Sequence, residues 1–456
     1  MRVLALSGRA GCSAFAALLL GCATTGQASY ETMHGDVDRA GFADQRVHVE
    51  DDHDLDGAVL DRATYVRVVL HRNTTIESAR QGWRAAVARI RQSGAFEDPM
   101  VSLEVAPLSI GSSSAPFGYT AAVSQRLPWP GKLSLDSSVA RAEADAMRSD
   151  FEATRRELAL TASLLYDDYF VNARSLEINA QHIALMRELK AGALAQFESG
   201  RGSEQDPLQA EAELTHLEHD AVVLASQRDI AVAQMNELLH RNPELPLPPP
   251  PRDLPVSAAP DAHNAAHLAD EAVSRRPEIA SMRSHARAEQ ARADRAARES
   301  YPDLAVSTSY NSMWDMPEHR WMVGLSLNLP IQVGRRAGAV EEANAARARF
   351  ESEAARLTDK ARTEVVVALK RIEEAAHVLH LYEARLIPVA RDQVDAARAG
   401  FVTSRNDFVA VIGAEKNLRS VELEYQMMRA DFDKQRAELD NARGRTPGLD
   451  DKEVAR

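Results

Sequence analysis

The sequence has few aromatic residues, almost no cysteine and no long apolar run beyond its first residues. Aromatic side chains make up 5% of its 456 residues, and the two cysteines are Cys12 and Cys22. We expect Cys12 to lie in a segment that is removed, so a mature chain with Cys22 alone forms no internal disulfide and no thiolate metal site. After residue 21, no apolar run approaches the roughly 18 residues of a membrane-spanning helix. Any crossing of a membrane would therefore have to use strands.

Clusters of basic residues are also missing. The formal net charge is −13, and no run of Lys and Arg occurs. Because binding to nucleic acid depends on clustered Lys and Arg that meet phosphates, we exclude a nucleic-acid partner. A glycine-rich phosphate loop and a nucleophile motif are likewise lacking. We therefore expect neither an enzyme nor a cofactor.

The first 21 residues have the composition of a secretory signal. Arg2 and Arg9 give a positive start, and the apolar stretch from Ala14 to Leu20 is too short to span a bilayer. The segment ends in Leu19-Leu20-Gly21-Cys22, which resembles a bacterial lipobox, where the cysteine is acylated. We predict a lipoprotein signal peptide at 1–21 and a lipid anchor at Cys22, with an ordinary signal peptide as the alternative.

The remainder contains an internal repeat. Pro99 and Pro302 are 203 residues apart, as are Gly131 and Gly334. Further pairs are 204 apart: Phe197 with Phe401, Ala210 with Ala414, Glu211 with Glu415, and Leu214 with Leu418. A constant spacing over most of the chain indicates duplication. The predicted segments are an acidic linker (22–60), a first repeat (61–242), a proline-rich linker (243–260), a second repeat (261–444) and a C-terminal tail (445–456).

Both repeats show the same order of elements. Period-two alternation of apolar and polar residues predicts strands at 101–108, 119–127, 303–310 and 321–329. A proline-free stretch predicts a very long helix from Ser134 to about Phe197. A similar stretch predicts a second one from Ala337 to Ala399, with a kink at Pro388. At 1.5 Å per residue, the first would be about 95 Å long, too long for a compact domain.

Strands with one apolar and one small, polar face suit a wall between lipid and water. Four strands cannot close a barrel, and an open sheet edge in hydrocarbon leaves costly unpaired backbone groups. We therefore expect three copies to close the wall together. The predicted fold is mainly α with a small β part, a duplicated helix–strand–strand–long-helix–helix unit. Three copies would give twelve strands for a barrel, and the long helices would suit a tube that crosses a periplasm.

Several motifs, in this order and spacing, resemble the TolC-like outer-membrane factor family. They are Asp98-Pro99, the segments 125–132, 200–203 and 206–211, and the segment 407–412. Pro-Trp-Pro-Gly-Lys at 128–132 is most similar to the branch that serves heavy-metal and cation efflux pumps. The resemblance implies a homotrimer without a cofactor. It would form a trimeric β-barrel in the outer-membrane lipid that continues into a periplasmic α-helical barrel. It would pass metal cations or small toxic compounds outward from an inner-membrane resistance-nodulation-division pump and a periplasmic adaptor.

By the same resemblance, two helical turns dock the adaptor and form the periplasmic gate. The implied residues are Gly200, Arg201, Gly202, Ser203 and Asp206 in the first turn, and Ser404, Arg405 and Asp407 in the second. The local pattern predicts that Asp206 caps the next helix with Pro207 at its first position, and that Ser404 or Asn406 caps the other. We also hypothesise that Asp206 and Arg405 pair to hold the closed tip.

Histidines and acids raise the question of a metal site. His48, Glu50, Asp51, Asp52, His53, Asp54 and Asp56 form a dense segment, which we interpret as a solvated linker rather than a site for divalent metal. Three pairs have helical spacing: His216 with His219, His263 with His267, and His377 with His380. Exposed histidines of this kind are common on helices, so we expect no metal site. Two other functions stay open, a duct for type I protein secretion and an envelope-spanning structural lipoprotein without a pore.

Overall fold

The computed structural model describes residues 26–40, 55, 57–254, 264–403 and 405–449. Cys22, Ser404 and the acidic segment 48–54 lie outside these described residues. The chain divides into two compact units, which are considered separately below. Unit 1 comprises residues 1–43, 79–150 and 280–355, and unit 2 comprises residues 44–78, 151–279 and 356–456.

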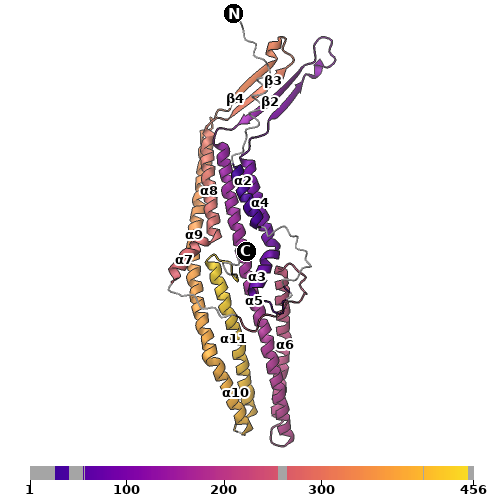
Figure 1. Cartoon of the computed structure of the whole chain (residues 1–456), viewed down its shortest axis with the longest axis vertical. Helices are drawn as coiled ribbons and strands as arrows, with labels where there is room; N and C mark the ends of the chain where they lie inside the picture. The colour runs from indigo at the N-terminus through magenta and orange to yellow at the C-terminus, as the bar shows by residue number, and fades with distance from the viewer. Residues whose placement is uncertain (1–25, 41–54, 56, 255–263, 404, 450–456) are drawn as a thin grey trace. The chain divides into compact units, whose positions relative to one another are not determined.

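The order of elements occurs twice along the chain (Figure 1). An additional helix, α2 (Gln27–Ala40), precedes the first copy. The first copy contains α3 (Arg62–Arg72), α4 (Thr74–Ser93), β1 (Met100–Val105), β2 (Tyr119–Leu127), α5 (Lys132–Glu198) and α6 (Gln205–Leu238). The second contains α7 (Ala265–Arg275), α8 (Pro277–Ala297), β3 (Leu304–Asn311), β4 (Trp321–Leu327), α9 (Val333–Leu381), α10 (Ile387–Val402) and α11 (Phe408–Ala442). The predicted mainly helical fold with a small β part is confirmed.

Unit 1 contains a four-stranded antiparallel sheet in the order β1-β2-β3-β4. Val101 is opposite Val123, Val123 is opposite Thr308, and Thr308 is opposite Val323, so one row of one face crosses all four strands. Because neighbouring residues of a strand point to opposite faces, the apolar residues predicted by alternation lie together.

Two strands end earlier than the alternation predicts. β1 ends at Val105 rather than at residue 108, because Pro107 has no N–H for a ladder and begins a 3-10 turn at Pro107–Ser109. β4 ends at Leu327 rather than at residue 329. The next residue, Asn328, instead accepts a hydrogen bond of 2.6 Å from Asp303 N through its side-chain oxygen.

A buried lysine joins strand and helix in unit 1. Lys132, the first residue of α5, is fully buried. Its Nζ donates to Asp303 Oδ1 at 2.7 Å and to the carbonyl of Tyr301 at 3.1 Å. The ring of Trp129 stacks on Tyr301 with 5.4 Å between centroids. These contacts fix the start of α5 to the segment that leads into β3.

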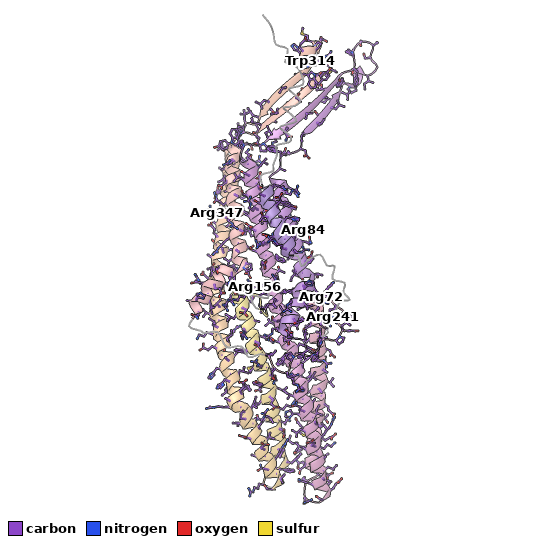
Figure 2. All side chains as sticks on the ribbon, in the orientation of Figure 1. Arg72, Arg84, Arg156, Arg241, Trp314 and Arg347 are labelled. Atoms are coloured by element: carbon purple, nitrogen blue, oxygen red, sulfur yellow. The ribbon has the colours of Figure 1, made fainter. Side chains whose placement is uncertain are left out.

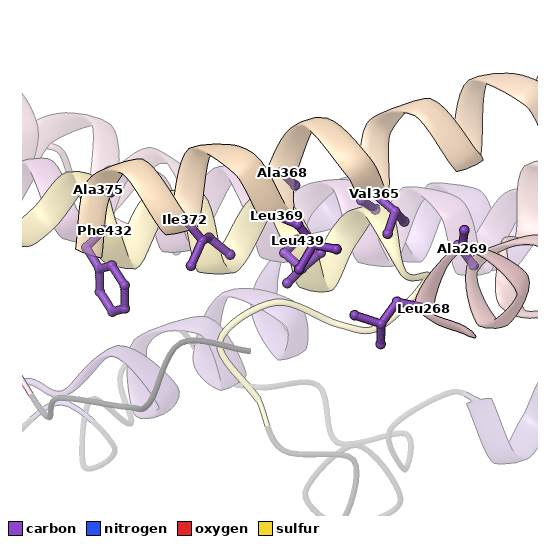
Figure 3. Close-up of a cluster of buried hydrophobic side chains, with 11 residues drawn as sticks. Leu268, Ala269, Val365, Ala368, Leu369, Ile372, Ala375, Phe432 and Leu439 are labelled. Atoms are coloured by element: carbon purple, nitrogen blue, oxygen red, sulfur yellow. The ribbon is translucent and has the colours of Figure 1, made fainter. Parts of the chain in front are cut away.

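The core of unit 2 lies between α7, α9 and α11. Figure 3 shows side chains of these three helices gathered into one cluster, with Leu268 from α7, Ile372 from α9 and Phe432 from α11. Beside it Arg156 of α5, labelled in Figure 2, donates to Asn441 Oδ1 at 2.8 Å and pairs with Glu278. Buried apolar contacts and paired charges thus hold distant segments of sequence together in this unit.

The long helices differ in continuity. α5 runs without interruption for 67 residues, about 100 Å at 1.5 Å per residue. The matching helix of the second copy is interrupted by a π-helical turn, Tyr382–Leu386, between α9 and α10. This turn directly precedes Pro388, so the predicted kink site is where the helix changes form. Among the described residues, no helix is both long and apolar enough to span a membrane.

Candidate functional site at the two helical turns

The first turn joins α5 to α6, which we call the first hairpin. Gly200 adopts a left-handed φ of +73°, and the N–H groups of Arg201 and Gly202 donate back to the carbonyl of Gln196 at 2.9 and 3.1 Å. These bonds satisfy carbonyls at the end of α5, as expected of a glycine-terminated helix. The predicted turn residues Gly200 to Ser203 therefore form a closed, well-bonded loop.

The predicted cap of α6 is wrong. The helix begins at Gln205 after Glu204, so Asp206 lies inside its first turn and Pro207 is its third residue. The helix starts earlier because Ser203 Oγ accepts a 3.2 Å hydrogen bond from Gln205 N. Asp206 instead accepts a long bond of 3.4 Å from Ser203 N. Its carboxylate still lies at the positive end of the helix dipole.

The second turn joins α10 to α11, which we call the second hairpin. The N–H groups of Arg405 and Asn406 donate to the carbonyl of Gly400 at 2.8 and 3.2 Å. Asp407 occupies the extended position before α11 and makes no capping bond with its side chain. The prediction that Asn406 is the cap is wrong, because its side chain lies against Gly400, where a Cβ would be 2.2 Å from its Nδ2. The alternative cap, Ser404, lies outside the described residues.

Apolar side chains join the two hairpins just behind these turns. Phe408, the first residue of α11, is buried in a cluster with Met186 of α5 and Leu214 of α6. The ring of Phe401 lies 5.2 Å from that of Phe408. Both turns of unit 2 are therefore backed by one shared apolar layer.

Ion pairs surround this apolar layer. Lys416 of α11 pairs with the buried Glu213 of α6 at 2.7 Å. Arg419 of α11 pairs with Asp220 of α6 at 2.6 Å. The hypothesised pair of Asp206 and Arg405 is not formed within the described part of this chain. The pairs that do join the hairpins lie further from the turns.

A buried acid in the second hairpin was missed by the sequence reasoning. Glu415 is 1% exposed, and its Oε1 accepts from Arg398 Nε and a second guanidinium N–H at 3.0 and 2.5 Å. Glu415 belongs to the repeat as the counterpart of Glu211. Since Glu211 is half exposed and pairs with Lys190, the repeat alone gives no signal that one of the two acids is buried.

A histidine on α5 faces this acid. His182 is 8% exposed, with Nε2 3.4 Å from Glu422 Oε2 and Nδ1 4.0 Å from Glu415 Oε2. Glu422 also accepts from Arg391 at 3.2 Å. The pKa of Glu422 is lowered, first by the hydrogen bond with His182 and also by Arg391, while burial acts in the opposite direction.

Comparisons with known proteins give a family for the second repeat. Residues 268–445, most of that repeat, match the model of the family described as outer membrane efflux protein. A comparison with curated protein sequences found no match.

Solved structures of outer-membrane channels have the same fold as this chain. OprN is similar with 18% identity and a TM-score of 0.70, over 84% of this chain and 89% of that one. CusC is similar with 16% identity and a TM-score of 0.71, over 84% and 92%. CmeC from Campylobacter jejuni is similar with 15% identity and a TM-score of 0.69, over 86% and 88%.

The predicted histidine pairs lie apart from the two turns. His216 and His219 are on α6, His377 and His380 are on α9, and His267 is on α7, while His263 lies outside the described residues. His219 contacts Asp220 at 3.4 Å. In the part of the chain that the structure describes, no three His, Cys, Asp or Glu side chains gather in a way that could hold a metal ion.

Proposed function

We propose that this chain is the outer-membrane channel component of a tripartite efflux pump and acts as a lipid-anchored homotrimer. The observation that carries the proposal is the exposed apolar face of the sheet, on a fold shared with solved outer-membrane channels. An inner-membrane pump of the resistance-nodulation-division type and a periplasmic adaptor would deliver substrate to it. Acylated Cys22 would attach the mature chain to the outer membrane.

The sheet presents an apolar face whose edge-strand side chains are not covered by any of the described residues. Val323 is 83% exposed, and the exposed apolar residues of the edge strands are Val101, Leu103, Val105, Trp321, Leu325 and Leu327. On the other face of the same strands are Ser102, Ser124, Ser307 and Ser326. A contiguous surface made of many exposed apolar side chains marks a contact with a membrane or a partner. The serine-rich face would line the water-filled channel.

The edges of the sheet require other copies of the chain. Within the described residues, the outer edges of β1 and β4 have no strand beside them. An unpaired edge in hydrocarbon costs several kcal/mol for each unsatisfied backbone group. Pairing of β1 in one copy with β4 in the next removes both edges, and three copies close the wall. The length of α5, about 100 Å, suits the wall of a duct that crosses the periplasm.

The two turns are the proposed sites of adaptor docking and gating. The residues are Gly200, Arg201, Gly202, Ser203 and Asp206, with Ser404, Arg405 and Asp407. Arg201, Ser203, Arg405 and Asp407 are exposed. Apolar residues beside them are exposed too, with Leu208 at 63% and Val402 at 78%. A mixed surface of exposed apolar and charged side chains is typical of a protein–protein contact.

For the exported substrate, we propose a chemical class only. The Pro-Trp-Pro-Gly-Lys segment at 128–132 supports metal cations or small toxic compounds as the exported class. In a tripartite system, the duct would accept what the pump delivers. Replacement of the cognate pump, with the same channel retained, would therefore change the exported substrate.

Planar-bilayer conductance of the purified, cross-linked oligomer tests the channel. We expect a trimer that forms pores. Val323→Arg places a charge on the apolar face and should abolish insertion, because arginine facing lipid near the bilayer centre costs about 2–4 kcal/mol. Ser326→Arg, on the other face of the same strand, is the matched control and should insert with altered conductance.

Two outcomes would favour an alternative function. A monomer without conductance in either lipid or detergent would exclude the channel and favour an envelope-spanning structural lipoprotein. A trimer that conducts but supports export of polypeptides rather than small solutes would indicate type I secretion.

A pull-down experiment tests the proposed docking site. Pull-down of the adaptor by wild type but not by Arg405→Glu would support the docking site, and equal pull-down would exclude Arg405 from it.

A further inference from the structure

His182 lies at a junction between the two hairpins. It belongs to α5 of the first hairpin, and the two carboxylates that it faces, Glu415 and Glu422, belong to α11 of the second. Its position is also fixed from behind, because Asn179, one turn earlier on α5, donates to the carbonyl of Leu217 in α6 at 2.9 Å. The imidazole is therefore held by the first hairpin and directed at the second.

Each carboxylate has one oxygen on an arginine and the other toward His182. Arg398 of α10 binds Oε1 of Glu415, and Arg391 of α10 binds Oε1 of Glu422. The remaining Oε2 of Glu415 is fully buried and has no hydrogen-bond partner. A buried acceptor without a partner costs about 1–3 kcal/mol, so this oxygen gains most from any donor that reaches it.

The other charged groups around the junction already have partners. On α6 and α11, Glu213 is paired with Lys416 and Asp220 with Arg419. On α5, Arg187 pairs with Glu218 and Lys190 with Glu211 of α6. Histidine is the side chain whose ordinary titration falls between about pH 5 and pH 8. Of the two histidines near these acids, His182 faces both carboxylates of α11, whereas the exposed His219 contacts only Asp220, at 3.4 Å.

We propose that His182 is a pH-responsive clamp that holds the second hairpin against the first. The imidazolium has two N–H donors and can bond to Glu415 and Glu422 together, whereas the neutral ring has one donor and can bond to only one of them. Protonation thus strengthens the contact between α5 and α11. The clamp is closed at low pH and weakens as the pH rises through the titration of the imidazole.

The lowered pKa of Glu422 agrees with this sign. A carboxylate that accepts hydrogen bonds from His182 and Arg391 stays charged as the pH falls below its ordinary range. Glu422 therefore remains an anionic acceptor for the clamp at low pH. The consequence for gating rests on the proposed function, because separation of the hairpins would then widen the periplasmic end of a duct.

Distances between spin labels on the two hairpins test the clamp directly. Labels at Ser199→Cys and Val402→Cys, both exposed positions, report the spacing of the hairpins in the detergent-solubilised full chain. Between pH 5.5 and pH 7.5 we expect the ratio of closed to separated forms to fall about fivefold, as for a weak coupling. His182→Gln should remove this dependence. His219→Gln, whose side chain is 73% exposed, is the matched control and should retain it.

Conductance separates failure of the clamp from failure of the channel. If wild-type pores open more as pH rises and His182→Gln pores do not change with pH, both proposals hold. If His182→Gln and wild type have the same pH profile in both assays, the clamp is excluded while the channel stands. If no pores form but the label distances still depend on pH through His182, the clamp stands and the proposed function fails.

Discussion

The two hairpins descend from one repeated pattern but use their matching residues differently. Ala210 and Ala414 occupy matching positions and are both buried. At the next position, Glu211 is half exposed on the first hairpin, whereas Glu415 is buried and paired with Arg398 on the second. The repeat therefore preserved the small residue that helix packing needs. The charge beside it became part of a buried network in one copy only.

The junctions between strand and helix show the same asymmetry. Lys132 of the first repeat is fully buried against Asp303, while its counterpart in the second repeat, Arg335, is exposed. A position that bears a positive charge in both copies is structural in one and solvated in the other. This teaches that repeat matching identifies where a helix starts, and that burial decides what each charge does.

Replacement of Lys132 should change the free energy of unfolding more than replacement of its counterpart, and by the largest amount of these predictions. Lys132→Ala leaves the carboxylate of Asp303 without its buried partner and should lower the free energy of unfolding by about 3–5 kcal/mol. Arg335→Ala, at the matching position, should change it by less than about 0.5 kcal/mol. Denaturant unfolding of both variants in detergent measures the difference.

A double replacement separates lost charge from lost packing at this junction. Lys132→Met combined with Asp303→Leu removes both charges and should recover part of the loss, since an apolar pair can replace a buried ion pair at little cost. The recovery is partial because Asp303 also accepts from Trp129 N at 2.9 Å and from Arg126 at 3.1 Å. If Lys132→Ala and Arg335→Ala have equal effects, the asymmetry between the repeats is wrong.

The buried side chain of Asp167 should make the stability of unit 2 depend on pH, whereas the matching residue of the second repeat should not. Burial raises the pKa of Asp167 to about 7, despite the nearby guanidinium of Arg62. Because the folded form holds a proton that the unfolded chain releases from about pH 4, stability falls as pH rises toward 7, by at most about 1.4 kcal/mol per pH unit. The residue 204 positions later, Arg371, is 57% exposed and carries no such effect.

Unfolding at a series of pH values checks this prediction. Asp167→Asn should flatten the fall in unfolding midpoint between about pH 5 and pH 7, whereas Arg371→Gln should leave it unchanged. A midpoint of Asp167→Asn that falls as steeply as that of wild type would show that another group carries the dependence.

Much of the fold could be predicted from the sequence because its signals are local or repeated. Period two placed the four strands, and freedom from proline placed α5 almost to its ends. The errors are also local in origin. Strand β1 ends at Val105, shortly before Pro107. Helix α6 begins before the predicted cap Asp206, because the hydroxyl of Ser203 accepts a hydrogen bond from Gln205 N at the helix start.

The turns themselves could be located by resemblance, but their chemistry could not be predicted. Arg398 and Glu415 pair within the second hairpin, but His182 belongs to the first hairpin and meets Glu415 only when the two hairpins pack. No spacing rule connects residues 182 and 415. The hypothesised pair of Asp206 and Arg405 is not formed within the described part of one chain. Residues in two separate turns need not be in contact, and the sequence does not show whether they are.

Neutralisation of the matching acids Glu415 and Glu211 should give a smaller difference in the free energy of unfolding. Glu415→Gln keeps the shape of the side chain but loses the charge that Arg398 binds, and should lower the free energy of unfolding by about 1–2 kcal/mol. Glu211→Gln, on the solvated side of the repeat, should leave stability unchanged within error. Denaturant midpoints at pH 7 measure both, and a larger effect from Glu211→Gln would contradict the assignment of Glu415 as the buried acid.

The interruption of the second long helix should yield the smallest effect. Pro388 cannot donate to the carbonyl of Ala384 and its ring would clash there, so the π turn at Tyr382–Leu386 widens the helix where the proline follows. In Pro388→Ala this reason disappears, and the helix can continue as α5 does. We expect stability to change by less than about 1 kcal/mol, because relief of the proline is offset by repacking of α10 on α11. The decisive measurement is the protection of amides 382–387 from hydrogen exchange, which should rise in Pro388→Ala if proline causes the interruption. Unchanged exchange would instead assign the π turn to the contacts of Tyr382 with Glu424 and of Tyr425 with Glu383, at 2.8 and 2.9 Å.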